Sequence, residues 1–310
     1  MTHYDQILVC LDRLDNVAPI FNYVQGTARQ FDSKAVFVVF MVAQPQLSEM
    51  PVRSVTEAES NLTPEQLHDL AREHMPQVNT EIIHADVVTG EPLIDILRLA
   101  HDRDVDLVVV ERRLGNTGDS DEEALLAERI TRKIHCSALI LPNDFKINAA
   151  NIIVPIRDSE CSANALEVAC EIAAKIPARI IALNVFHVGA SGYTRVGTTF
   201  DEHHQLLREA ADRESASLLE HVNTHGASVT VVADPDLRGK PAPVILEAVS
   251  RNHGDLVVIG ARGRTDAAGV LLGNVTEQLI HNCSVPVLAV KKKGECLGVL
   301  RALLTLASEG

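Results

Sequence analysis

The chain of 310 residues contains no tryptophan, and aromatic residues make up only 3% of it. Proteins that bind single-stranded nucleic acid usually stack the bases on aromatic side chains, so this class is poorly supported. Basic residues are also scarce, because 28 Lys and Arg stand against 42 Asp and Glu and give a formal net charge of −14. Since phosphate backbones are bound mainly by Lys and Arg, we expect no nucleic-acid partner.

Long apolar runs are absent too. The longest, residues 35–43, is far shorter than the roughly 20 residues that span a bilayer, so we expect no membrane contact of that kind. The first 15 residues carry Asp5 and Asp12 and no basic region before their apolar stretch, unlike a secretion signal. The six cysteines form no CxxC pair, and a chain of this length does not need disulfides. The sequence therefore predicts a cytoplasmic protein with reduced thiols.

What the sequence does contain is an internal repeat. Residues 7–12 (ILVCLD) resemble residues 152–158 (IIVPIRD), and residues 89–110 resemble residues 238–259 over their whole length. The segments around Cys136 (HCSALIL) and Cys283 (NCSVPVLAV) form a third pair. The repeat therefore predicts two tandem copies of one domain. We predict domain 1 at residues 1–145, domain 2 at residues 150–293 and a tail at residues 294–310.

Each half alternates short β-branched runs with amphipathic segments of helical period, which is typical of βαβ units wound into a parallel sheet. The predicted class is α/β with two tandem doubly wound domains. In the second half we predict strands at residues 151–156, 179–186, 228–233, 256–260 and 285–291. The predicted helices span residues 159–175, 200–224, 242–252 and 274–282. In the first half, Thr63-Pro64-Glu65-Gln66 has the residues of a helix N-terminus.

Glycines follow the fourth predicted strand of the second half. Gly260-Ala261-Arg262-Gly263 is followed by nine residues and then by Gly273-Asn274-Val275-Thr276, which opens a helix. In such sheets ligands bind at the carboxyl ends of the strands, and free N–H groups at a helix start attract phosphate. The alternative is structural: Gly260 and Gly263 would serve a tight strand exit, and Gly273 close helix packing.

The spacing G-x2-G-x9-G, followed by VTEQLIHNCSVPVLAV, resembles the nucleotide-binding signature of the universal stress protein (UspA) family, and the repeat resembles its tandem E type. The resemblance implies a five-stranded parallel sheet of the HUP or Rossmann-like kind in each half, with helices on both faces. It also implies ATP, with or without Mg, held between the loops after strands one, two and four.

Carried onto this sequence, the resemblance places phosphate and ribose contacts at the glycine motif and adenine contacts on the first two strands. Arg262 flanks the glycines and could neutralise phosphate or be a solvated loop charge. The implied binding residues are Pro155, Arg157, Val185, Gly260, Arg262, Gly263, Gly273, Asn274, Val275 and Thr276. Two of them depart from the family: Asn274 stands where binders have Ser or Thr, and Arg157 where they have Asp.

The first half departs further. Glu111 and Leu114 occupy the positions of Gly260 and Gly263, and the acidic segment 119–128 follows. Phosphate should be repelled there, so we predict no nucleotide site in this half, although Asp12 could match the family's acidic adenine contact.

Other candidate motifs are weaker. His135-Cys136 and His281 with Cys283 offer too few ligands for a tetrahedral metal site, so we predict no metal. His203-His204 is expected in solvent, and residues 234–236 (Asp-Pro-Asp) are expected to form a turn. Residues 291–293, three lysines, are expected to be an edge charge that aids solubility. The apolar tail should pack against the body or a partner.

No catalytic motif is present: GxSxG, HExxH and a complete P-loop are all missing. Enzymatic activity is therefore uncertain, and we expect at most slow ATP hydrolysis. Our hypothesis is a cytoplasmic stress-response module that binds ATP or a related adenine nucleotide in domain 2, its domains packed as an intramolecular pseudo-dimer. The alternative is a nucleotide-independent scaffold that acts through an unidentified protein partner. The sequence leaves open whether the whole chain forms a homodimer.

Overall fold

A computed structural model describes residues 4–15, 17–43, 56–112, 120–146, 149–189, 199–261 and 272–293. These residues fall into two compact units. Unit 1 comprises the described residues up to 146 together with 291–293, and unit 2 comprises 149–261 and 272–290. Arg262, Gly263 and Leu114, all named above, lie outside the described residues, as do residues 294–310.

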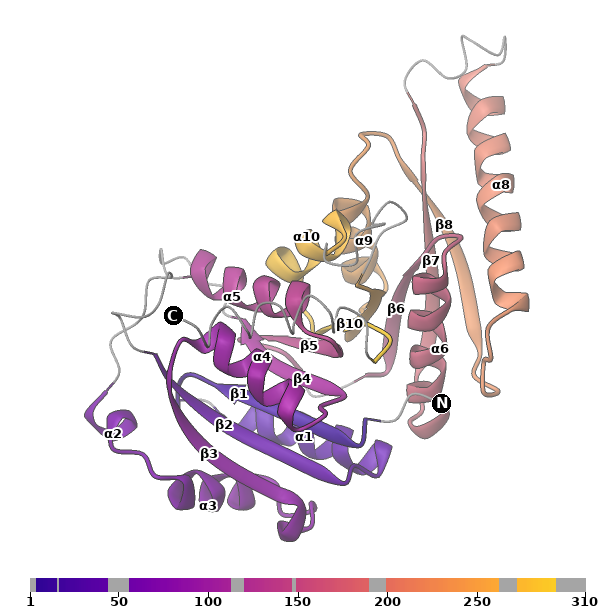
Figure 1. The fold of residues 1–310 in the computed structure, drawn as a ribbon. Helices are drawn as coiled ribbons and strands as arrows, with labels where there is room; N and C mark the ends of the chain where they lie inside the picture. The colour runs from indigo at the N-terminus through magenta and orange to yellow at the C-terminus, as the bar shows by residue number, and fades with distance from the viewer. Residues whose placement is uncertain are drawn as a thin grey trace. The chain divides into compact units, whose positions relative to one another are not determined.

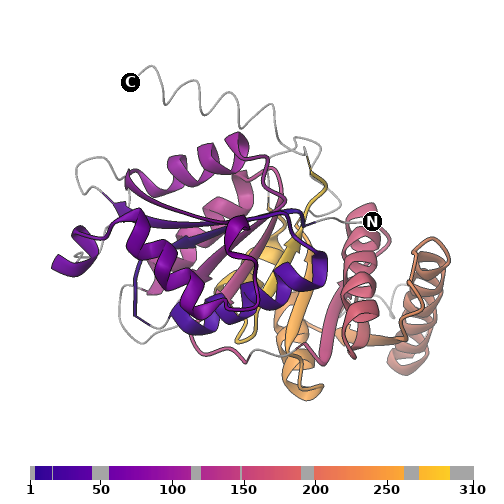
Figure 2. The ribbon, with the colours of Figure 1, turned by 90° about the horizontal axis from the view of Figure 1, so that it is seen from below.

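Unit 1 contains a parallel five-stranded sheet in the order β3-β2-β1-β4-β5. Its strands are β1 (Gln6–Leu11), β2 (Ala35–Ala43), β3 (Ile83–Gly90), β4 (Leu107–Arg112) and β5 (Ser137–Pro142). Its helices are α1 (Val17–Phe31), α2 (Glu57–Ser60), α3 (Pro64–His74), the 3₁₀ turn η1 (Thr80–Ile82), α4 (Pro92–Asp102) and α5 (Ser120–Lys133). Helix α1 contacts α3 and α4 contacts α5, so that the helices cover both faces (Figures 1 and 2).

Unit 2 repeats this architecture with the order β8-β7-β6-β9-β10, again all parallel (Figure 1). Its strands are β6 (Asn151–Ile156), β7 (Arg179–His187), β8 (Val229–Asp236), β9 (Leu256–Gly260) and β10 (Val287–Val290). Its helices are α6 (Glu160–Lys175), α8 (Phe200–Glu220), α9 (Pro241–Arg251) and α10 (Asn274–Asn282). The predicted α/β class of two doubly wound five-stranded domains is therefore confirmed.

The predicted element ends differ by two to four residues at three places. Strand β8 ends at Asp236 rather than 233, so residues 234–236 pair with β7 and the turn predicted there is wrong. Strand β10 begins at Val287 rather than 285, directly after Pro286, which has no N–H to donate to a sheet. Helix α8 ends at Glu220 rather than 224, and the chain then turns through Gly226 at φ +80°. The predicted helix start in the first half is present: Thr63 caps α3, with Pro64 at its first position and Gln66 bonding back to the Thr63 N–H.

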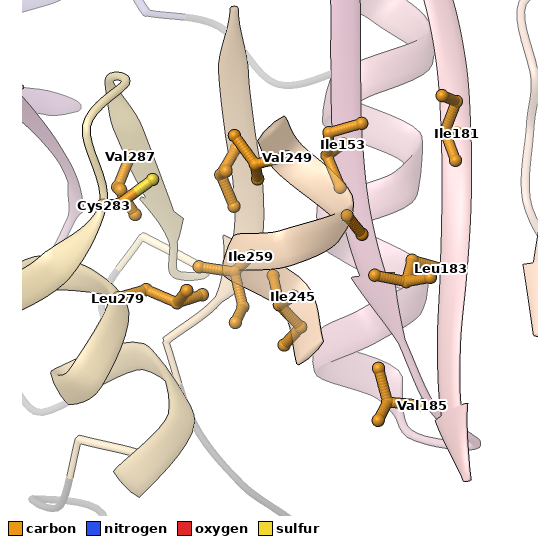
Figure 3. Packing of buried hydrophobic residues seen from close by; sticks show 12 residues of the cluster. Ile153, Ile181, Leu183, Val185, Ile245, Val249, Ile259, Leu279, Cys283 and Val287 are labelled. Carbon is orange, nitrogen blue, oxygen red and sulfur yellow. The ribbon is translucent and has the colours of Figure 1, made fainter. Parts of the chain in front are cut away.

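The core of unit 2 shows how the sheet is covered on both faces. Figure 3 shows Ile153, Ile181, Leu183 and Val185 on the face of β6 and β7 that packs against α9 and α10. The neighbouring residue Phe186 instead packs with Ala211 of α8. Because side chains alternate between the faces of a strand, α8 lies on the opposite face from α9 and α10.

The three lysines after β10 are not simply an edge charge. The Lys291 side chain is buried, and its Nζ donates to the main-chain oxygens of Ile134 (2.9 Å) and Arg132 (3.3 Å) at the end of α5. Lys293 Nζ lies 2.8 Å from a carboxylate oxygen of Asp104 and 2.7 Å from one of Asp106. The solubility interpretation is therefore wrong for Lys291 and Lys293, which hold residues 291–293 within unit 1.

Candidate functional site

The carboxyl ends of the central strands of unit 2 carry the predicted site residues. Strands β6, β7 and β9 are parallel, so Ile156, His187 and Gly260 end them at one edge of the sheet. Helix α10 begins at the same edge, because the Gly273 N–H donates to the Ala261 oxygen over 3.0 Å. The structure thus brings Gly260 and the start of α10 together.

Gly260 is required for close packing. A Cβ atom built at this position would lie 2.7 Å from the main-chain oxygen of Cys161 and 2.8 Å from its Cβ. Cys161 is in the first turn of α6, which follows β6. Any side chain at Gly260 would therefore push α6 away from β9, and this supports the structural explanation for this glycine.

Thr276 holds the start of α10 in place. Its side chain is buried, and its hydroxyl donates to the main-chain oxygen of Gly260 over 3.1 Å. Because that hydroxyl proton is already used, Thr276 can offer a ligand its main-chain N–H but no side-chain donor.

Among the residues that the structure describes, no side chain caps the N-terminus of α10. Its N-cap residue, Gly273, lies in the extended region at φ −64° and ψ 137°. By contrast Thr63, Ser159 and Thr199 cap α3, α6 and α8 with their hydroxyl oxygens. The first N–H groups of α10 are thus left for another acceptor, and a helix N-terminus favours a negatively charged one.

Asn274 and Val275 have different surroundings within this first turn. Asn274 is exposed, and its Oδ1 accepts a hydrogen bond from Gln278 Nε2 at 2.6 Å. Val275 is half-buried and packs against the core of unit 2. The Asn274 side chain is therefore at the surface, where its amide nitrogen is directed to no described acceptor.

The residues predicted beside adenine lie on neighbouring strands. Pro155 on β6 is half-buried and pairs in register with Leu183. Val185 is two residues further along β7, and its side chain is buried in the cluster of Figure 3. Val185 therefore contributes its main chain, rather than its side chain, to the edge of the sheet.

Arg157 directly follows β6, and its side chain is exposed. Its N–H donates to Ser162 Oγ at 3.1 Å, and the next N–H, of Asp158, donates to Glu214 Oε1 at 2.7 Å. Asn184, buried on β7, donates to the Ala211 oxygen and so ties the strand to α8, which carries Glu214. Ser162, Glu214 and Asn184 were not predicted from the sequence, where only Asn184 carries a signal, as a polar residue inside the apolar run of β7.

In unit 1, the corresponding edge at the carboxyl ends of the strands carries charged side chains. Glu111 and Arg112 occupy the positions of Gly260 and Ala261, and Arg112 is only 1% exposed. Glu59 is 5% exposed, and its carboxylate accepts the Leu14 N–H (3.3 Å) in the loop after β1 and the Thr56 N–H (2.9 Å). A buried carboxylate at this loop disfavours a phosphate ligand in unit 1.

Several of the described thiols and one histidine are buried and have shifted pKa values. Burial raises the pKa of the Cys136 thiol to about 12 and that of Cys170 to about 11, and it also raises the pKa of Cys10. Desolvation lowers the pKa of His135, whose side chain is buried. Within the described residues, no three His, Cys, Asp or Glu side chains are arranged to hold a metal ion. In the same part of the chain, no helix is long and apolar enough to cross a membrane.

Comparison with known proteins agrees with this architecture. The sequence model of the universal stress protein family matches residues 3–142 and again residues 149–291. A universal stress protein of Methanocaldococcus jannaschii is 32% identical over 142 residues, which make up 46% of this chain and 81% of that protein. The solved universal stress protein of Archaeoglobus fulgidus DSM 4304 has 17% identity and a TM-score of 0.58, covering 94% of this chain and 98% of its own. Another universal stress protein, which covers 46% of this chain with 22% identity and a TM-score of 0.32, was solved in complex with cAMP.

The repeated strand order and the parallel sheets define a duplicated doubly wound α/β protein. The chain belongs to the universal stress protein family, with two tandem family domains.

Proposed function

We propose that this universal stress protein is a cytoplasmic stress-response module that binds ATP, or a related adenine nucleotide, in its second domain. The phosphates lie against the first turn of α10, and the base lies towards the ends of β6 and β7. The observation that carries the proposal is the uncapped start of α10 beside the end of β9, an arrangement that offers main-chain N–H groups to an anion.

The first domain serves as a structural partner of the second in this proposal. Its corresponding edge holds the buried Glu59 carboxylate at the loop after β1 and carries Glu111 in place of a glycine. At this edge the Glu59 carboxylate already accepts the Leu14 and Thr56 N–H groups, so these are not available to a phosphate. Nucleotide binding should therefore have a stoichiometry of one per chain.

A substitution at the N-cap of α10 tests the proposal. Gly273 has backbone angles that any residue adopts, so Gly273→Asp can place a carboxylate on the helix N–H groups. That carboxylate occupies the proposed phosphate position and repels the ligand, whereas Gly273→Asn caps the helix without charge. By isothermal titration with Mg-ATP we expect parental binding, weaker binding by Gly273→Asn and none by Gly273→Asp.

The competing function is a scaffold that acts through protein contacts without nucleotide. The packing role of Gly260 and the internal bond of Thr276 are the observations that favour it, since both residues are explained without a ligand. Absence of heat from Mg-ATP at millimolar concentration with the parental protein would support the scaffold and overturn the nucleotide proposal. Equal binding by all three proteins would show that nucleotide does not bind at the start of α10 and would overturn the proposed site.

A further inference from the structure

A surface cavity in unit 1 lies away from the edge discussed above. It has a volume of about 60 Å³ and is formed by β1, β2 and β3 on one side and the end of α4 on the other. Leu8, Phe37 and His84 lie side by side in register on the three strands, and Val39 pairs with Asp86 two residues further along. These five side chains share one face of the sheet, which is covered by Leu99 of α4 and by Arg103 directly after that helix.

The polar groups around this cavity are arranged about one aromatic ring. The His84 ring stacks on Phe37 with centroids 5.2 Å apart and an interplanar angle of 23°. The Arg103 Cζ atom lies 5.2 Å from the centroid of the same ring. A guanidinium that rests on an aromatic ring keeps its N–H groups free at its edge, where they can pair with a carboxylate.

These charged groups have no partner of opposite charge among the described residues. The guanidinium of Arg103 makes no hydrogen bond or ion pair within that part of the chain. Asp86 accepts only the N–H of its neighbour Val87, at 2.8 Å, and no described cation pairs with it. The cavity therefore has a floor of Leu8, Val39 and Leu99, and its lining includes two solvent-exposed charged side chains without a described partner, the cation of Arg103 and the carboxylate of Asp86.

The second copy of the domain provides an internal comparison. By strand register, Ile153, Ile181 and Leu183 of unit 2 correspond to Leu8, Phe37 and Val39. By register and helix position, Thr230, Val232 and Asn252 correspond to His84, Asp86 and Arg103. The three residues on β6 and β7 are buried in the core of unit 2, facing α9 (Figure 3).

Unit 2 forms the same fold with other residues at these positions. The fold itself therefore does not require Phe37, His84, Asp86 or Arg103. Their presence together in unit 1 alone points to a ligand whose charges match theirs. A carboxylate fits Arg103, and an ammonium fits Asp86. The apolar floor and the small volume fit a short aliphatic side chain.

We propose that the cavity between Phe37, His84, Asp86 and Arg103 binds a small aliphatic α-amino acid. Its carboxylate pairs with Arg103, its ammonium with Asp86, and its side chain lies on Leu8, Val39 and Leu99. This site is separate from the proposed nucleotide site and is tested without nucleotide.

The test uses three probes of nearly equal shape: L-valine, isovalerate, which lacks the ammonium, and isobutylamine, which lacks the carboxylate. Each is titrated into the ¹⁵N-labelled full chain, and the amide resonances of residues 84–86 and 103 are followed. We expect L-valine to shift them and each of the other two to bind about tenfold more weakly, since each lacks one charged hydrogen-bonding group.

Variants make the test specific. Arg103→Gln should weaken L-valine and isovalerate, and Asp86→Asn should weaken L-valine and isobutylamine. Arg98→Gln is the matched control, because Arg98 lies on α4, five residues before Arg103, and pairs with Asp95 instead. The proposal is overturned if L-valine leaves these resonances unchanged at millimolar concentration, if isovalerate binds as tightly as L-valine, or if Arg98→Gln weakens binding as much as Arg103→Gln.

Discussion

The hydroxyl of Thr276 donates a hydrogen bond to the main-chain oxygen of Gly260, with 3.1 Å between the two oxygens. Thr276 is in the first turn of α10, and Gly260 ends β9. This bond and the one from the Gly273 N–H to the Ala261 oxygen fix the helix start beside the strand end. The N–H groups proposed to bind phosphate are thereby positioned before any ligand arrives, which lowers the entropic cost of binding.

Removing the Thr276 hydroxyl should destabilise unit 2. Thr276→Val keeps the shape of the side chain but leaves the Gly260 oxygen without this donor, and we expect a loss of about 1–2 kcal/mol in the free energy of unfolding. Thr276→Ser restores the hydroxyl and should lose less. Urea unfolding measures both, and equal stabilities of the two variants would show that the bond contributes nothing.

Adding a methyl group at Gly260 should also destabilise the protein. Gly260→Ala places a Cβ within 3 Å of Cys161, and relieving the contact should cost about 2 kcal/mol. Gly26→Ala is the matched control: Gly26 lies within α1, and a Cβ there would meet nothing within 4 Å. Because alanine favours helix, that variant should gain about 0.5–1 kcal/mol in thermal or urea unfolding. Opposite signs for the two substitutions are the predicted result; a neutral Gly260→Ala would contradict the close packing.

The two lysines held in unit 1 should differ in their contributions. Lys291 is buried and donates to two main-chain oxygens at the end of α5, so Lys291→Met should cost about 1–3 kcal/mol. The side chain of Lys293 is 42% exposed, and solvent screens its ion pairs with Asp104 and Asp106. Lys293→Met should cost less than about 1 kcal/mol.

The salt dependence of stability distinguishes the contribution of Lys291 from that of Lys293. Raising the ionic strength should shrink the cost of Lys293→Met and leave that of Lys291→Met nearly unchanged. A larger loss of stability for Lys293→Met than for Lys291→Met in urea unfolding would reverse the assignment.

Acid should weaken the fold partly through His135. Desolvation lowers the pKa of its imidazole in the folded protein below the ordinary value of 6.5, so the buried ring stays neutral while the unfolded chain takes up a proton. The unfolded state then binds more protons, and the free energy of unfolding falls as the pH drops below about 6.5.

His135→Gln removes this titration, so its stability should fall less steeply than that of the parent between about pH 7 and pH 5. Urea midpoints measured across this range test the difference. Parallel curves for the two proteins would exclude His135 as a contributor.

The general architecture follows from local sequence patterns. The apolar runs at residues 151–156 and 256–260 have the length and burial of central parallel strands, and the structure forms β6 and β9 at those residues. Correspondence between the halves follows from the repeat, because residues 89–110 hold α4 and most of β4, and residues 238–259 hold α9 and most of β9. These features are determined by residues that are close together in the sequence, so they can be predicted from it.

The features that the sequence analysis missed depend on distant contacts. Gly260 faces Cys161, almost one hundred positions earlier in the chain, and Lys291 bonds to the end of α5. Glu214 accepts the Asp158 N–H only because α8 passes over the loop after β6. Nothing local to Gly260 distinguishes a glycine that packs against a helix from one that binds phosphate, so that distinction required the structure.

The central claim is that the first turn of α10 binds the phosphates of a nucleotide, and the amide resonances of this turn test it directly. Titrating Mg-ATP into ¹⁵N-labelled protein should shift the amides of Asn274, Val275 and Thr276, since their N–H groups gain anionic acceptors. The amide of Leu14 in unit 1, which already donates to Glu59, should not move. Unchanged resonances at residues 274–276 at millimolar Mg-ATP, or shifts confined to unit 1, would contradict the account.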